Sequence, residues 1–265
     1  FCISLFISPA IFFLRETKKD ILVSGVFIIM ISIFYIYGSS YENKFKASDI
    51  DTNAFKIRII GSNISLDRFY RDIDPVSVIN ELIELSDPKK DEKTIFVWPE
   101  GILPDISQKD LVKYNWLFNE RFNDNHLLVI GINSQFNDQE VINFYNTLSI
   151  YDHNLKLIKS YNKINLVPFG EFLPFENVLK KIGLKSITNN YQSFSKGDSR
   201  DIIKIHNKNF SLKFLPLICY EIIYSGKIFK DNNFDFIINI SEDGWFGKSV
   251  GPKQHFTHSI FRSIE

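Results

Sequence analysis

The chain of 265 residues carries 31 Lys and Arg against 31 Asp and Glu, a formal net charge of +0 at pH 7. This balance argues against a nucleic-acid binder, which relies on an excess of basic residues facing phosphates. A content of 45% hydrophobic and 15% aromatic residues excludes a disordered tail, and two cysteines exclude a disulfide-stapled mini-domain or a multi-cysteine zinc site.

The first forty residues have the composition of membrane-spanning segments. Residues 1–14 are almost entirely apolar, residues 15–20 are mostly charged, and residues 21–38 contain no charge. As a helix, the last segment is about 27 Å long at about 1.5 Å per residue, close to the hydrocarbon thickness of about 30 Å. We therefore expect a partial spanning helix at 1–14 and a full one at 21–38, in a fragment truncated at both ends.

The charged loop between these segments indicates an orientation. Its basic residues Arg15, Lys18 and Lys19 favour the cytoplasmic side, which would leave residues 41–265 on the opposite side. A signal peptide fits less well, because the chain lacks a basic start and has two apolar blocks. A buried helix of a soluble domain is the remaining alternative.

Residues 41–265 alternate between strand and helix patterns, without an internal repeat or a low-complexity linker. This alternation predicts a single α/β domain. The expected strands are residues 55–60, 94–98, 127–132, 146–151, 155–161, 211–219 and 234–240. The expected helices are residues 75–85, 108–122 and 254–264. The strands at 146–151 and 155–161 form a predicted hairpin.

Three of these strands end in reactive groups. Glu100 follows the strand at 94–98, Cys219 ends the strand at 211–219, and Ser241 follows the strand at 234–240. Ligand sites of open α/β sheets form beyond the carboxyl ends of strands, so we expect these groups to converge. Lys163, in a loop rich in aromatic residues and proline, supplies a cation.

A cysteine, a glutamate and a lysine together suit acyl transfer. A thiol with a pKa of about 8.5 needs a base to become a nucleophile, and a carboxylate can take its proton. An ammonium stabilises the oxyanion of the tetrahedral intermediate. Taken singly, each residue also has a structural interpretation: a buried small side chain, a helix-start charge and a solvated surface lysine.

Four segments in order carry a resemblance to a known family. They are VWPEGILP (97–104), YNKINLVPFGEFLPF (161–175), PLICYEIIYS (216–225) and NISEDGWFGKSVGPKQHF (239–256). They resemble the carbon-nitrogen hydrolase (nitrilase) superfamily and, more closely, its membrane-bound branch, the apolipoprotein N-acyltransferases. The stretch PFGEFLPFE and the pairing of WFG with GPxQHF point to that branch.

The resemblance implies a nitrilase-like α-β-β-α sandwich at 41–265, missing its C-terminal part and preceded by transmembrane helices at 1–40. It implies a multi-pass protein of the bacterial inner membrane with a periplasmic catalytic domain. The implied reaction moves a fatty acyl chain from a phospholipid, phosphatidylethanolamine in the typical case, to the N-terminal amine of the diacylglyceryl-cysteine of an apolipoprotein. No cofactor, metal or nucleic acid is implied.

The resemblance also assigns roles to residues. Cys219 matches the nucleophile, Glu100 the general base and Lys163 the oxyanion stabiliser. The supporting and substrate-binding positions are Glu171, which orients the lysine, Tyr220 and Glu221, which follow the nucleophile, and Trp245, Phe169, Phe172 and Phe175, which are candidates for lining the lipid entry.

Some features leave alternatives open. Glu242 stands where the family more often has asparagine, and we expect it to place an extra negative charge near the site. His255 and His258 have a spacing compatible with metal ligation, but no third ligand lies nearby in the sequence, and we favour an ordinary helix face. The competing functions are a membrane-tethered amidase that uses water as acceptor and a catalytically silent membrane module.

Overall fold

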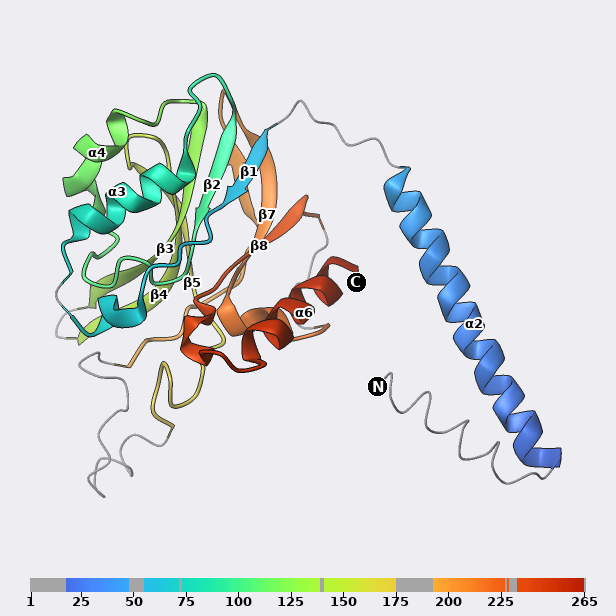
Figure 1. The fold of residues 1–265 in the computed structure, drawn as a ribbon. Helices are drawn as coiled ribbons and strands as arrows, with labels where there is room; N and C mark the ends of the chain where they lie inside the picture. Colours follow the sequence, from blue (N-terminus) through green and yellow to red (C-terminus); the bar gives the residue numbers. More distant parts are fainter. Residues whose placement is uncertain are drawn as a thin grey trace. The chain divides into compact units, whose positions relative to one another are not determined.

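The computed structural model describes residues 18–47, 55–71, 73–138, 141–174, 193–226, 228 and 233–264. The chain divides into two compact units, Phe1–Asn53 and Ala54–Glu265. The described part of the first unit is helix α2 (Lys18–Lys46), drawn in blue in Figure 1. The helix expected at 1–14 lies outside the described residues.

Helix α2 contains the segment Ile21–Lys44, which has a mean hydropathy of 2.3. By length and composition it is the one helix in the described part of the chain that suits a membrane crossing. The helix runs past Gly38, the expected end, to Lys46.

The second unit contains two sheets, and the first has five strands in the order β1-β2-β3-β4-β5. Strands β1, β2 and β3 are parallel, and β3, β4 and β5 are successively antiparallel. Their bounds are β1 Lys56–Ile59, β2 Thr94–Trp98, β3 His126–Asp138, β4 Val141–Tyr151 and β5 Leu157–Asn162.

The second sheet has the order β6-β7-β8. Its strands are β6 (Ile203–His206), β7 (Ser211–Ile218) and β8 (Phe236–Ile240). Strand β7 is antiparallel to β6 and parallel to β8. The two sheets face each other across one buried cluster, in which Val97 and Ile150 of the first sheet join Phe214 and Ile238 of the second. They therefore form the two inner layers of a sandwich.

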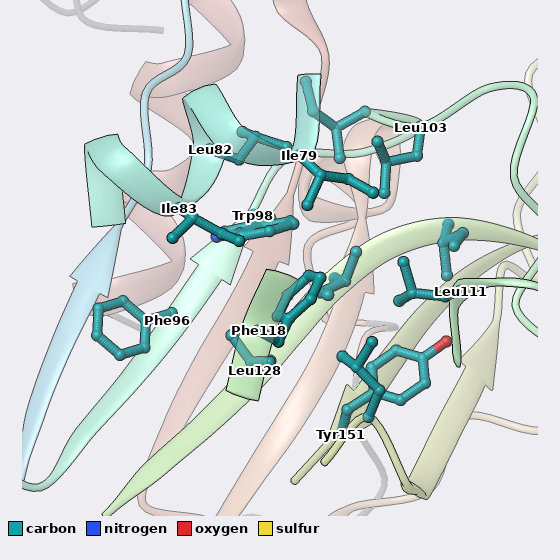
Figure 2. Close-up of a cluster of buried hydrophobic side chains, with 14 of the residues drawn as sticks. Ile79, Leu82, Ile83, Phe96, Trp98, Leu103, Leu111, Phe118, Leu128 and Tyr151 are labelled. Carbon is teal, nitrogen blue, oxygen red and sulfur yellow. The ribbon is translucent and has the colours of Figure 1, made fainter. Parts of the chain in front are cut away.

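The outer face of the first sheet is covered by helices α3 (Pro75–Ser86) and α4 (Asn115–Asn119). Helix α3 begins where the Asp74 side chain accepts a hydrogen bond from the Val76 amide at 3.1 Å, the usual N-cap arrangement. Figure 2 shows its apolar face, with Ile79 and Leu82, packed around Trp98. This cluster buries one face of the sheet that carries Glu100.

Short helices follow the strands of the second sheet. Single-turn η3 (Cys219–Ile223) follows β7, η4 (Asp243–Phe246) follows β8, and α6 (Gly251–Ile264) contacts both. Ile222 of η3 packs with Leu215 and Leu217 on the outer face of this sheet. The two packed sheets, with helices outside the first, agree with the expected nitrilase-like fold. Figure 1 shows α6 at the end of the sandwich where β7 and β8 finish.

Most expected elements are present, with differences in length. The expected helix at 108–122 is replaced by the short helix η2 (Leu111–Tyr114) followed by α4. Strands β3 and β4 extend beyond the expected segments and pair with each other from Leu128 and Tyr151 to Asp138 and Val141. Strand β6 was not expected.

Candidate active site

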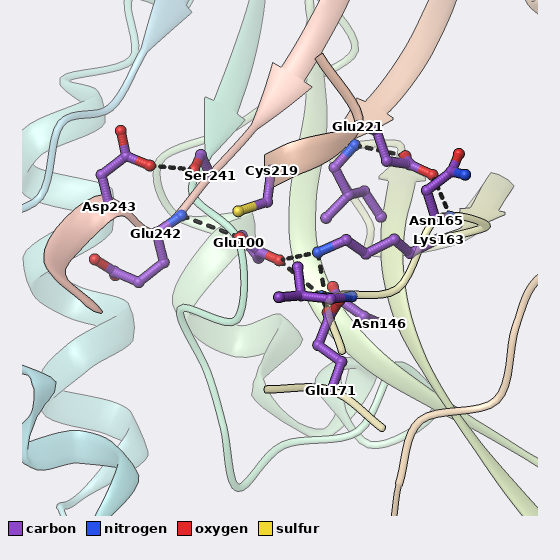
Figure 3. Close-up of polar contacts among 12 residues, drawn as sticks. Glu100, Asn146, Lys163, Asn165, Glu171, Cys219, Glu221, Ser241, Glu242 and Asp243 are labelled. Carbon is purple, nitrogen blue, oxygen red and sulfur yellow. Dashed lines mark hydrogen bonds and ion pairs between the residues drawn. The ribbon is translucent and has the colours of Figure 1, made fainter. Parts of the chain in front are cut away.

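The reactive groups lie where strands end. Glu100 follows β2, Cys219 is the first residue after β7, and Ser241 is the first after β8. Lys163 directly follows β5, and its amide donates to the Asn146 carbonyl at 2.9 Å. Figure 3 shows the sulfur of Cys219 directed toward Glu100, with Lys163 approaching the same carboxylate. The structure thus brings the three expected residues together.

Lys163 lies between two carboxylates. Its Nζ is 3.2 Å from Glu100 Oε1 and 3.0 Å from Glu171 Oε1, and its side chain is fully buried. The side-chain amide of Asn146 (Nδ2) donates to the same two oxygens at 2.7 Å each. Glu171 is anchored by the Val167 amide, which donates to Oε2 at 2.9 Å. These bonds fix the lysine relative to Glu100.

Lys163 is held as a cation. Burial lowers the pKa of its ammonium, but attraction by Glu100 and Glu171 outweighs burial and raises the pKa overall. The group is therefore a fixed positive charge in a water-poor place. Such a charge stabilises an oxyanion more strongly than a solvated one.

Cys219 is a free thiol with 9% of its surface exposed. Burial, followed by the negative charge of Glu100, raises its pKa to about 12, although the positive charge of Lys163 acts in the opposite direction. The sulfur is directed toward the Glu100 carboxylate (Figure 3), which can act as an acceptor for the thiol proton. At neutral pH the resting sulfur keeps its proton.

This raised pKa has a measurable consequence for alkylation by iodoacetamide, which reacts with the thiolate. We expect the alkylation rate at Cys219 to rise about tenfold per pH unit up to pH 10, whereas a thiol with an ordinary pKa of about 8.5 levels off near pH 9. Peptide mass spectrometry of the 219 peptide gives the rate. A plateau at Cys219 below pH 9 would contradict the raised pKa.

Glu221 binds both the lysine loop and the cysteine turn. Its buried carboxylate accepts hydrogen bonds from the amides of Ile164 and Asn165 at 2.9 Å each and from the amide of Ile218 at 3.0 Å. Arg200 Nη2 adds an ion pair at 2.7 Å. One carboxylate therefore sets the position of the segment that follows Lys163 and of the residue that precedes Cys219.

Sequence reasoning missed several members of this site. Asn146 joins the two glutamates, Arg200 neutralises Glu221, and the Tyr161 hydroxyl donates to both Glu221 oxygens at 2.9 Å. Burial and the Glu221 charge raise the pKa of Tyr161 and keep this donor protonated. Tyr161 was visible in the YNK motif, but Asn146 and Arg200 carried no local signal.

Glu242 does not present a free charge to the site. Its carboxylate pairs with buried Arg68, which also donates to the carbonyls of Ile64 and Ser65 at 2.9 and 3.1 Å. The Glu242 amide donates to Glu100 Oε2 at 3.1 Å. The expected extra negative charge is thus neutralised, and the residue acts on the site through its backbone.

Replacing Glu242 by asparagine should lower the thermal midpoint of the protein by about 10 °C. The change leaves the Arg68 guanidinium buried without its carboxylate, which costs about 3–5 kcal/mol, and 1 kcal/mol corresponds to about 2–4 °C in a domain of this size. Tryptophan fluorescence recorded during thermal unfolding measures this midpoint. The control Arg71→Gln removes an exposed pair of 3.9 Å and should change little; equal midpoints for the two variants would contradict the interpretation.

Gly131 of β3 allows the chain around Glu100 to approach closely. A Cβ at this position would lie 2.3 Å from the Pro99 carbonyl oxygen and 2.5 Å from Glu100 Cα. A side chain at position 131 would therefore displace the backbone of Pro99 and Glu100.

We expect Gly131→Ala to cost about 1–3 kcal/mol of stability and about 100-fold in acylation rate, because the displaced carboxylate no longer meets the thiol. Thermal unfolding and the rate of covalent acylation measure the two effects. The matched control is Gly61→Ala, since a Cβ there meets nothing within 4 Å. Unimpaired acylation in Gly131→Ala would show that the close approach is dispensable.

The other expected residues are more exposed. Tyr220 is 40% exposed, and Trp245 is 51% exposed and packs on the Phe69 ring at 4.8 Å. Phe169 is 55% exposed and Phe172 is half-buried. Phe175 lies outside the described residues.

Comparison with known proteins agrees with this geometry. The family model "Carbon-nitrogen hydrolase" matches residues 118–265, more than half of the chain. The chain belongs to the carbon-nitrogen hydrolase family. The matched region contains Lys163, Glu171 and Cys219, and Glu100 precedes it.

The chain is also similar to curated proteins named apolipoprotein N-acyltransferase. The chain is 27% identical over 276 residues to an apolipoprotein N-acyltransferase from Rhodopseudomonas palustris, covering 99% of this chain and 50% of the relative. It is 33% identical over 177 residues to one from Rhizobium leguminosarum bv. trifolii, covering 64% of this chain and 32% of the relative. The chain thus spans half or less of the length of these relatives.

Solved structures of low similarity also match. A glutamine-dependent NAD+ synthetase from Acinetobacter baumannii aligns with a TM-score of 0.44 and 20% identity over 70% of this chain and 32% of that one. An amidase from Nesterenkonia sp. aligns with a TM-score of 0.43 and 13% identity over 75% of this chain and 71% of that one.

Proposed function

We propose that this chain is the catalytic part of a membrane-bound apolipoprotein N-acyltransferase. The observation that carries the proposal is the buried cluster in which Lys163 pairs with the Glu100 carboxylate and the Cys219 sulfur is directed toward that same carboxylate (Figure 3). The similarity to relatives named apolipoprotein N-acyltransferase gives this chemistry its substrates. The acyl donor is a phospholipid, phosphatidylethanolamine in the first instance, and the acceptor is a diacylglyceryl apolipoprotein.

In the first half-reaction the thiol of Cys219 attacks the ester carbonyl of the phospholipid. Glu100 takes the thiol proton as the carbon–sulfur bond forms, and the Lys163 ammonium stabilises the oxyanion. The carbon–oxygen ester bond then breaks, and Glu100 returns the proton to the leaving oxygen. A lysophospholipid departs and a thioester remains on Cys219.

In the second half-reaction the N-terminal amine of the apolipoprotein attacks the thioester. Glu100 accepts a proton from the amine, Lys163 again faces the oxyanion, and the carbon–sulfur bond breaks. The proton passes back to sulfur, which restores the thiol and releases an N-acylated lipoprotein. Glu171 orients Lys163 throughout, and Glu221 holds the loop and the turn that carry the lysine and the cysteine.

The membrane setting follows from the substrates. Both are lipids, so anchoring confines enzyme and substrates to one surface, and α2 has a segment of the length and composition that a membrane crossing needs. We propose a multi-pass protein of the bacterial inner membrane, with membrane segments in residues 1–40 and a periplasmic catalytic domain in residues 41–265. Exposed Trp245, Tyr220, Phe169 and Phe172 are the proposed contacts to the lipids.

The test is acyl transfer by the whole protein in vesicles of phosphatidylethanolamine, with a diacylglyceryl lipopeptide as acceptor. Mass spectrometry should show the lipopeptide gaining one acyl chain while lysophospholipid accumulates. Release of ammonia from small amides without acyl transfer would instead establish the amidase. The absence of both reactions in the folded protein would establish a catalytically silent module, and either result would overturn the proposal.

A further inference from the structure

His255 is a buried histidine that the proposed steps do not use. It lies on α6, is 5% exposed, and contacts two residues near the thiol. Its Nδ1 is 2.7 Å from Asp243 Oδ1, and its Nε2 is 3.0 Å from the carbonyl oxygen of Cys219 itself. The sequence favoured an ordinary helix face here, and the structure instead joins this residue to the nucleophile.

Both nitrogens of the imidazole face hydrogen-bond acceptors. A backbone carbonyl only accepts, so Nε2 donates to the Cys219 carbonyl while Nδ1 faces the Asp243 carboxylate. Asp243 is itself fixed, since the Ser241 hydroxyl donates to the same Oδ1 at 2.6 Å, as Figure 3 shows. Both ring nitrogens are thus engaged within the protein.

Aromatic rings restrict the imidazole further. The ring centroid of Tyr220 lies 6.2 Å away in a stacked arrangement, and that of Phe246 lies 6.4 Å away. The histidine is thus held by one carboxylate and two rings, and it can in turn hold the Cys219 carbonyl in a fixed direction.

The backbone of Cys219 needs such support. Its φ is 52°, in the left-handed region that costs a non-glycine residue about 1–2 kcal/mol. The turn is held before Cys219 by Glu221, which accepts from the Ile218 amide, and after it by His255. Because the peptide bond is planar and trans, fixing the Cys219 carbonyl also fixes the Tyr220 amide, which points in the opposite direction.

We propose that His255, paired with Asp243, is a positioning residue that holds the Cys219 carbonyl and so keeps the nucleophile in its strained, reactive conformation. The inference rests on one part of the proposed function, the acylation of Cys219. It does not depend on which lipid or lipoprotein is the substrate. Loss of this hydrogen-bond donor lets the turn relax toward ordinary backbone angles. The thiol then leaves its place beside Glu100 and Lys163.

The experiment measures acylation of Cys219 by p-nitrophenyl butyrate, a small activated ester that needs no phospholipid binding. The burst of p-nitrophenolate gives the rate, and intact mass confirms the thioester. We expect His255→Phe, which keeps a ring between Tyr220 and Phe246, to slow the burst about 10- to 100-fold, because it removes the hydrogen-bond donor of the Cys219 carbonyl and leaves that buried acceptor unsatisfied. His255→Gln restores a donor to the carbonyl and should recover most of the rate.

The control is His258→Phe, three residues along the same helix and half-buried, which should leave the burst and the thermal midpoint unchanged. A burst in folded His255→Phe within twofold of the wild type, or equal losses in the Phe and Gln variants, would overturn the proposal. If His255→Phe does not fold, Asp243→Asn decides: a slowing of about tenfold supports the pair, and an unchanged rate refutes it. A wild-type burst without transfer to the lipopeptide would count against the proposed substrates alone.

Discussion

Replacing Cys219 by alanine should abolish acyl transfer to the lipopeptide and remove the covalent acyl adduct from the protein. The sulfur is the atom that carries the acyl chain between the two half-reactions, and no other side chain among the described residues can take its place beside Glu100 and Lys163. The fold should persist, because alanine is small and apolar and the Cys219 side chain is buried. Intact-mass analysis after incubation with phosphatidylethanolamine alone measures the adduct.

The chain offers a matched control for this substitution. Cys2, the other cysteine, belongs to the apolar segment at 1–14, and Cys2→Ala should keep both the adduct and the transfer. An acyl adduct that persists in Cys219→Ala would assign the nucleophile to another residue. A Cys219→Ala protein that still acylates the lipopeptide would show direct transfer without a thioester.

The strand ends account for what the sequence could predict about the site. Strand β2 is five buried residues closed by proline, so its bounds and the place of Glu100 after it followed from hydrophobicity alone. The same reasoning placed Cys219 and Ser241 after β7 and β8. Parallel pairing of β7 with β8 brings these last two to one edge, as the rule for carboxyl ends of strands predicts.

The longer hairpin shows why other elements were missed. Beyond the predicted strands, β3 and β4 continue through pairs such as Ser134 with Tyr145 and Phe136 with Asn143, which show no regular alternation of apolar and polar residues. Asn146, the first residue of the predicted strand at 146–151, supports Glu100 and Glu171, but its position in a strand did not reveal this role. Residues whose strand position depends on pairing with a distant partner, and not on burial, give no periodic signal.

The supporting contacts were missed for a related reason. Arg200 with Glu221, Arg68 with Glu242, and His255 with Cys219 join residues far apart in the chain through buried polar atoms. Rules based on composition or spacing evaluate each residue without its distant partner. A single Arg or His is then most often interpreted as a surface group. The resemblance to a known family identified Glu100, Lys163 and Cys219. The network of contacts that holds them could be seen only in the structure.

Replacing Lys163 by methionine should slow thioester formation by at least about 1000-fold. Methionine has a similar length and can fill the buried space, but it removes the positive charge that faces the oxyanion, and loss of one such donor typically costs about 100- to 1000-fold. The change also leaves the carboxylates of Glu100 and Glu171 without the cation between them. Their repulsion moves Glu100 away from the thiol, which adds to the loss.

The burst with p-nitrophenyl butyrate measures this rate, and Lys159→Met, an exposed lysine of the same strand β5, is the matched control. Changing Glu171 to glutamine in the Lys163→Met background separates the two contributions. It removes the repulsion but not the missing donor, so it should restore about tenfold and no more. Complete recovery in the double variant would mean that Lys163 serves only to neutralise the glutamates, whereas no recovery would assign the whole effect to the oxyanion.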